Sequence, residues 1–145
     1  MSFCLSRQRL MVGVLLAAAV SYAQANVTVS DAWIREVPPQ SRVAAAFLAI
    51  QNSAAAPDQI VAMTSPLAER VEWHDMRHEQ GRMQMSQRMK PELPAAMTTR
   101  LAPMQSHLML IDLKQPLRVG MQVPIALTLA SGNVLRLTAE VRATR

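Results

Sequence analysis

Residues 70–87 read RVEWHDMRHEQGRMQMSQ, and this stretch predicts a β-hairpin that turns at Gln80-Gly81. Side chains alternate along a strand, so a turn of two or four residues brings the histidines and methionines of both strands to one face. These residues are His74, Met76, His78, Met83 and Met85. The other face carries Val71, Trp73 and Asp75, of which Trp73 is expected to anchor the core. A three-residue turn would separate His74 from Met85, so the grouping depends on the turn.

The chain outside this hairpin reads as a succession of short strands from residue 26 onward. Apolar or alternating runs predict strands at 27–34, 43–51, 59–64, 97–101, 107–113, 122–129 and 134–141. The alanines in 43–51 leave a short helix possible there. Prolines mark loops at 36–41 and 90–96. Eight or nine such strands in all predict an all-β sandwich or barrel with Greek-key connections.

The first 25 residues have the pattern of a secretory signal peptide. Arg7 and Arg9 precede an apolar run of eleven residues at 10–20, and Ala23-Gln24-Ala25 provides a small-x-small cleavage site before Asn26. The run is shorter than the roughly 20 apolar residues of a membrane-spanning helix. We therefore expect export to a periplasmic compartment, a single domain over residues 26–145, no stable membrane insertion and a monomeric protein.

Composition excludes several classes of protein. The single cysteine, Cys4, lies in the predicted leader, so a blue-copper centre, a thiol oxidoreductase and a cysteine hydrolase are not expected. No motif joins a nucleophile to a general base, and we expect no enzyme. Without Arg7 and Arg9 the chain carries 13 basic and 10 acidic side chains, a net charge of +3. These charges are scattered, so nucleic-acid binding is not expected either.

Two histidines and two methionines recur at spacings that core packing does not require. Ten residues separate His74 from Met85, twenty-one separate Met85 from His107, and one separates His107 from Met109. Imidazole nitrogen and thioether sulfur suit monovalent copper, whereas magnesium and calcium take oxygen ligands. These donors also stay available in an oxidising compartment, where thiolates are lost to disulfides. The working hypothesis is a Cu(I) site.

The remaining methionines and the third histidine have less specific interpretations. We expect five methionines to fill the core, because an unbranched thioether adapts to irregular gaps. These are Met63, Met89, Met97, Met104 and Met121. Met76 and Met83 share the proposed metal face, and His78 lies near the hairpin tip. For these three, a secondary contact with copper and a purely structural or solvated role both stay open.

The complete spacing of histidines and methionines resembles the signature of the periplasmic copper chaperones called PCu(A)C, which have a cupredoxin-like β-fold. The likeness covers nearly all of the chain after the leader. It includes DAWIR at 31–35 before a double proline, Asn52, ELPA at 92–95, MLIDL at 109–113 and Pro116-Leu117. Some members carry a His- and Met-rich tail that holds a second, divalent copper. This chain ends at Arg145 without one, so no tail site is expected.

The resemblance implies a Cu(I) metallochaperone that delivers copper to the dinuclear copper centre of cytochrome c oxidase or to an assembly factor. Its metal ligands would be His74, Met85, His107 and Met109. A copper sequestration or resistance protein of the same compartment would use the same ligands and is the alternative. A structural or adhesive β-module without metal is the third possibility.

Overall fold

The computed structural model describes residues 26–144, and within this range the chain forms ten strands. They are β1 (Val27–Arg35), β2 (Val43–Asn52), β3 (Asp58–Thr64), β4 (Ala68–Glu79), β5 (Arg82–Gln87), β6 (Glu92–Leu93), β7 (Met97–Leu101), β8 (His107–Leu113), β9 (Gln122–Leu129) and β10 (Val134–Arg142). The described part contains no helix, and therefore none that could cross a membrane. This confirms the predicted all-β class. The predicted signal peptide lies outside the described residues.

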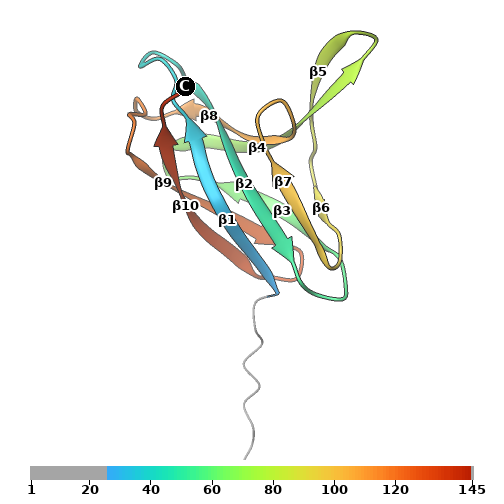
Figure 1. The fold of residues 1–145 in the computed structure, drawn as a ribbon. Helices are drawn as coiled ribbons and strands as arrows, with labels where there is room; N and C mark the ends of the chain where they lie inside the picture. Colours follow the sequence, from blue (N-terminus) through green and yellow to red (C-terminus); the bar gives the residue numbers. More distant parts are fainter. Residues whose placement is uncertain (1–25, 145) are drawn as a thin grey trace, which may run out of the picture.

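The strands form one curled sheet in the order β5-β4-β8-β2-β1-β10-β9-β3-β6, with β7 also paired to β2. Strands far apart in the sequence lie side by side, as β8 does with β2 and β10 does with β1. The β1–β10 pair is parallel and the other pairs are antiparallel. Figure 1 shows the sheet folded over, with β1 and β2 in front of β3 and β4. These crossovers give the predicted Greek-key arrangement.

The core lies between the two sides of the folded sheet. On β9 the side chains alternate, with Val123, Ile125, Leu127 and Leu129 buried and their neighbours more exposed. On β4 the same alternation buries Val71, Trp73 and Asp75. Trp73 is only 3% exposed, which confirms its predicted role as a core anchor. The intervening β4 residues therefore point away from the core.

The segment at 43–51 is a strand and not a helix. β2 runs through the middle of the sheet and pairs with β1 on one edge and with β7 and β8 on the other. Nearly continuous burial along β2 follows from this central position. The predicted loop at 90–96 contains β6, two residues that pair with β3. The side-chain amide of Asn52 on β2 donates a 3.0 Å hydrogen bond to the Leu93 carbonyl and so ties β2 to β6.

The prediction that five methionines fill the core is wrong for three of them. Met89, Met97 and Met104 are 73%, 56% and 73% exposed. Met89 and Met104 lie in loops, and Met97 begins β7 on its outward side, so the core offers them no space. Met63 and Met121 pack against the core as predicted.

The β4–β5 hairpin turns through Gln80 and Gly81, whose φ angles are 49° and 74°. Positive φ at both central residues is the geometry of a tight two-residue hairpin turn. The turn pairs His78 with Met83 and Met76 with Met85. Of the turn lengths that the sequence left open, the structure has two residues, which puts the histidines and methionines of both strands on one face. The hairpin projects beyond the folded sheet, as Figure 1 shows at the β5 label.

Candidate metal centre

His74 and His107 are cross-strand neighbours. The register of β4 with β8 sets them directly opposite each other, and their ring centroids are 5.9 Å apart. Both side chains point away from the core, because the alternate residues Trp73 and Leu108 point into it. Pairing of β4 with β8 thus brings together two imidazoles from separate parts of the chain.

Met85 reaches the same place from β5. Its sulfur lies 2.9 Å from Nδ1 of His74. Met109 is two residues beyond His107 on the same face of β8, where it stands opposite Glu72 of β4 and Ala45 of β2. All four residues of the predicted spacing therefore lie on one face of the β5-β4-β8 part of the sheet.

Each histidine has an acceptor at one ring nitrogen. Nε2 of His74 lies 2.9 Å from a carboxylate oxygen of Glu72. Nδ1 of His107 lies 3.1 Å from the carbonyl oxygen of Gln105. When these nitrogens carry the proton, Nδ1 of His74 and Nε2 of His107 present their lone pairs to a metal. Glu72 thus selects the nitrogen of His74 that faces Met85, a role that sequence reasoning did not identify.

The site is open on one side. His107 as a whole residue is 7% exposed, and the side chain of His74 is 15% exposed. Met85, in contrast, is 52% exposed on the edge strand. The histidines are therefore largely covered, while the methionine of β5 is accessible from solvent.

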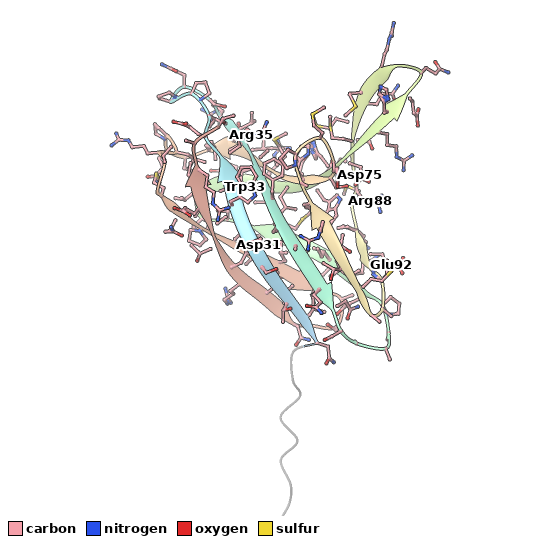
Figure 2. All side chains as sticks on the ribbon, in the orientation of Figure 1. Asp31, Trp33, Arg35, Asp75, Arg88 and Glu92 are labelled. Carbon is pink, nitrogen blue, oxygen red and sulfur yellow. The ribbon has the colours of Figure 1, made fainter. Side chains whose placement is uncertain are left out.

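Aromatic rings continue the row of side chains beyond His107. The ring of Phe47 on β2 lies 6.3 Å from His107, and the ring of Trp33 on β1 lies 4.6 Å from Phe47. The guanidinium groups of Arg35 and Arg142 stand over Phe47 and Trp33 at 5.6 and 5.9 Å. Figure 2 shows Trp33 and Arg35 together on this side of the sheet. The Phe47 ring therefore covers His107 from the side of β2, and Trp33 packs behind it.

A buried carboxylate ties the surrounding segments together. Asp75 accepts hydrogen bonds from Trp73 Nε1 at 2.9 Å, from Ser106 Oγ at 2.7 Å and from Arg88 Nε at 2.6 Å. Arg88 follows β5 and Ser106 precedes His107, so Asp75 joins β4 to both segments (Figure 2). Burial alone would raise the pKa of Asp75, but the hydrogen bonds from Ser106, Trp73 and Arg88 outweigh it and lower the pKa.

Sequence reasoning placed Asp75 on the inner face but did not identify this network. The one available signal was Ser106 directly before His107, because a serine hydroxyl can donate a hydrogen bond to a nearby carboxylate. The hydroxyl of Ser106 donates the hydrogen bond that Asp75 accepts. The loop is therefore held by a side-chain hydrogen bond that a glycine could not form.

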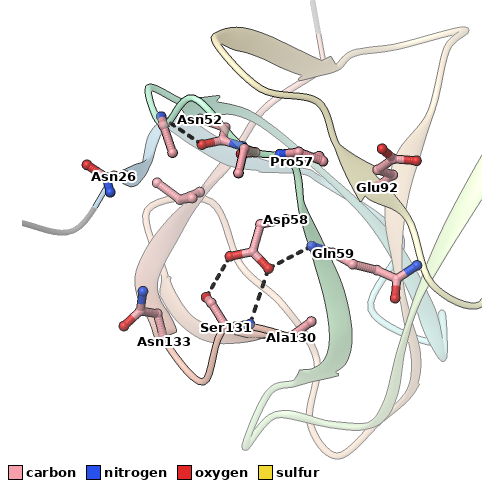
Figure 3. A pocket seen from close by; sticks show the side chains of 12 residues that line it. Asn26, Asn52, Pro57, Asp58, Gln59, Glu92, Ala130, Ser131 and Asn133 are labelled. Carbon is pink, nitrogen blue, oxygen red and sulfur yellow. Dashed lines mark hydrogen bonds between the residues drawn. The ribbon is translucent and has the colours of Figure 1, made fainter.

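A pocket at the opposite end of the sheet has different chemistry (Figure 3). One carboxylate in its lining, Asp58, accepts hydrogen bonds from Ser131 Oγ at 2.6 Å and from the Gln59 backbone N–H at 2.8 Å. Burial alone would raise the pKa of Asp58. These two hydrogen bonds and a third from the Ser131 backbone N–H outweigh burial, so the pKa is lowered. The residues that line this pocket include no histidine or methionine. The lining of this pocket thus lacks the imidazole and thioether donors that surround His74 and His107.

Comparisons with known proteins place the chain in a family. The lipoprotein family model LpqE-like matches residues 27–141. Lxx21020 of Leifsonia xyli subsp. xyli, which is named as a lipoprotein, is 30% identical over 118 residues, and the match covers 81% of this chain and 70% of that protein.

Solved structures share the fold. Apo-DR1885 from Deinococcus radiodurans is 32% identical, with 99% of this chain and 97% of that chain covered and a TM-score of 0.62. Its CuI form is 28% identical over 86% of this chain and 81% of that one, with a TM-score of 0.61. The copper-bound PCuAC domain from PmoF2 is 22% identical over 85% and 97%, with a TM-score of 0.70. This chain, with its cupredoxin-like β-fold, therefore belongs to the LpqE-like family, the family of the PCuAC domains.

Proposed function

We propose that this protein is a periplasmic Cu(I) chaperone whose metal ligands are His74, Met85, His107 and Met109. The observation that carries the proposal is the meeting of three donor side chains from three strands. His74 and His107 are opposite each other with ring centroids 5.9 Å apart, and the Met85 sulfur is 2.9 Å from His74 Nδ1. The CuI form of DR1885, 28% identical, supports the choice of metal.

The donor set matches the chemistry of Cu(I). Two imidazole nitrogens and two thioether sulfurs are neutral and soft, so they suit a soft monovalent cation better than a hard divalent one. The Glu72 carboxylate beside His74 adds a negative charge close to the ion. It is shared with Arg70, whose guanidinium lies 3.3 Å from its other oxygen. The site is therefore suited to copper that arrives and leaves as Cu(I).

Access to the site favours transfer over storage. Met85 is half exposed on the projecting hairpin, whereas the two histidines are largely covered. An acceptor's ligand can displace Met85 first while the histidines still hold the ion. Stepwise exchange of this kind avoids release of free copper. A fully enclosed site would hold copper but release it slowly.

The recipient and the compartment belong to the same proposal. The family resemblance indicates delivery to the dinuclear copper centre of cytochrome c oxidase or to an assembly factor that loads it. The signal-peptide pattern of residues 1–25 and the lipoprotein names of the family model and of Lxx21020 support export. We propose a monomeric carrier with no enzymatic activity.

The test is an anaerobic Cu(I) titration in competition with a chelator, followed by transfer to an apo copper domain of an oxidase. His107→Ala and Met109→Ala are expected to weaken tight binding strongly. Met89→Leu and Met104→Leu, which change exposed methionines outside the site, serve as controls and should bind as the unchanged protein does. Tight binding without transfer would favour sequestration. Binding that His107→Ala leaves unaltered would remove both copper functions.

A further inference from the structure

The projecting half of the β4–β5 hairpin carries donor side chains that the site described above does not use. On the face shared with His74, cross-strand pairing sets His78 opposite Met83 and Met76 opposite Met85. The opposite face of the same segment is entirely polar. It carries Arg77, Glu79, Arg82, Gln84 and Ser86. Nitrogen and sulfur donors are thus segregated to one face.

Core packing does not account for this segregation. All six residues of β5 are exposed, and β5 is an edge strand beyond which the described residues place no further strand. Met83 is 42% exposed, and His78 is exposed as well. Figure 2 shows the hairpin standing clear of the rest of the sheet, with side chains projecting from both of its faces. Methionine here has no irregular gap to fill, which is its usual structural use.

The geometry brings three donors within reach of one ion. Side chains directly opposite each other on antiparallel strands have Cβ atoms about 4.5–5.5 Å apart, which applies to His78 and Met83. Met76 lies two residues from His78 on the same face, about 7 Å along the strand. Long, flexible thioethers close that gap. One imidazole nitrogen and two sulfurs form a soft donor set of the kind that selects Cu(I).

We propose that Met76, His78 and Met83 form a second, weaker Cu(I) site on the outer half of the hairpin. This inference rests on the proposed function, because the second site is a step on the route by which copper reaches and leaves the His74–His107 site. Met76 stands opposite Met85, so an ion moves between the two sites by exchange of neighbouring sulfurs along one face. The outer site is weaker because it has three donors, and its exposed side chains lose rotamer freedom when they bind.

The test measures how many Cu(I) ions the protein holds under anaerobic conditions, with bicinchoninate as the competing chelator. The unchanged protein is expected to bind two ions, the second about 10-fold or more weakly because its site has fewer ligands and no outer-shell partner. The triple variant Met76→Leu/His78→Gln/Met83→Leu should bind one ion with the first affinity retained. The matched control Arg77→Gln/Gln84→Ala changes the opposite face and should still bind two.

Methionine-methyl NMR identifies the ligands independently of stoichiometry. In the unchanged protein the second equivalent should shift the methyl resonances of Met76 and Met83, and the exposed Met89 and Met104 should not move. Circular dichroism of the triple variant establishes that it is folded. Retention of the tight ion in that variant provides a second check.

Three outcomes would overturn the second site. One is a single bound ion in the unchanged protein, removed by His107→Ala, which leaves the proposed function standing. Another is a second ion that persists in the triple variant. The third is a triple variant with unaltered copper binding but slower transfer to the acceptor domain, which would make this face a protein-docking surface. Absence of any bound Cu(I) would instead refute the proposed function.

Discussion

Two hydrogen-bond acceptors orient the facing rings of His74 and His107, whose centroids are 5.9 Å apart. Glu72 lies at Nε2 of His74, and the Gln105 carbonyl lies at Nδ1 of His107. The two rings are therefore held through opposite nitrogens. This arrangement leaves the other nitrogen of each ring for the proposed metal, so substitutions of these two acceptors test the site as directly as substitutions of the histidines.

Removing the carboxylate beside His74 should weaken Cu(I) binding. Glu72→Ala is expected to lower the affinity about 10- to 100-fold, the usual effect of losing an outer-shell partner of a metal-bound histidine. Glu72→Gln keeps an acceptor oxygen and should retain part of the affinity. Competition titration measures both.

Glu69→Gln is the matched control for this prediction. Glu69 also lies on β4, but its side chain is 61% exposed and pairs with Lys114 at 3.4 Å. An exposed ion pair of this kind contributes at most about 1 kcal/mol to stability, and it does not touch the site. Equal affinities for Glu72→Ala and Glu69→Gln would show that Glu72 does not position His74.

Loss of the Asp75 carboxylate should destabilise the protein. Asp75→Asn removes the charge that Arg88 neutralises and disturbs the hydrogen bonds from Trp73 and Ser106. Hydrogen bonds to a charged group contribute about 1.5–3 kcal/mol each, and the half-exposed Arg88 can partly resolvate. We expect the free energy of unfolding in urea to fall by about 2–3 kcal/mol.

The control for Asp75 is Asp112→Asn. Asp112 is 43% exposed and makes ion pairs with Arg42 and Arg70 at 3.4 and 3.9 Å. Its loss should cost less than about 1 kcal/mol. A destabilisation by Asp75→Asn no larger than that of Asp112→Asn would mean that the buried network does not hold the three segments together.

The stabilisation by Asp75 should depend on pH. Its pKa in the folded protein is lowered from the ordinary value of 3.8, so the folded state binds the proton less readily than the unfolded state. The carboxylate therefore stabilises the fold fully above the unfolded pKa, and this stabilisation is lost as pH falls below about 4 through the folded pKa. The difference in unfolding free energy between the unchanged protein and Asp75→Asn should be constant from about pH 5 to 7 and shrink below about pH 4.

Asp58 also has a lowered pKa and contributes in the same acidic range. Because it is present in both proteins, its contribution cancels in this difference. Urea unfolding at a series of pH values provides the measurement. A difference that grows on acidification would contradict the assigned direction of the Asp75 shift.

A metal at the site should protect Met85 from oxidation. Ag(I) is a soft, redox-inert replacement for Cu(I), and a thioether bound to it cannot easily be converted to the sulfoxide. Met85 is 52% exposed and should oxidise readily without metal but slowly with one equivalent of Ag(I). Met89 and Met104, each 73% exposed, should oxidise at the same rate with and without metal. Peptide mass mapping after peroxide treatment follows each methionine. Protection of all three alike would indicate nonspecific binding.

Local patterns in the sequence predicted most of the strands. The segments 97–101, 107–113 and 122–129 match β7, β8 and β9 end to end. Alternation and turn residues are local properties of the chain, so they can be read without a partner strand. The two residues of β6 could not be found this way, because only pairing with β3 makes them a strand. The predicted burial of Met89, Met97 and Met104 was wrong for a related reason, since burial depends on which elements cover a residue.

The sequence alone determined the all-β class, and it showed that an even-numbered turn would put the hairpin's histidines and methionines on one face, because backbone alternation has a strict period of two. The structure decided that the turn at Gln80-Gly81 has two residues. Only the tertiary structure decided that β4 lies beside β8 with His74 opposite His107. It also decided that Glu72 and the Gln105 carbonyl orient their rings, and that Asp75 joins Arg88 to Ser106. These contacts join distant segments whose register is set by burial of the whole sheet, and no local stretch of sequence encodes that register.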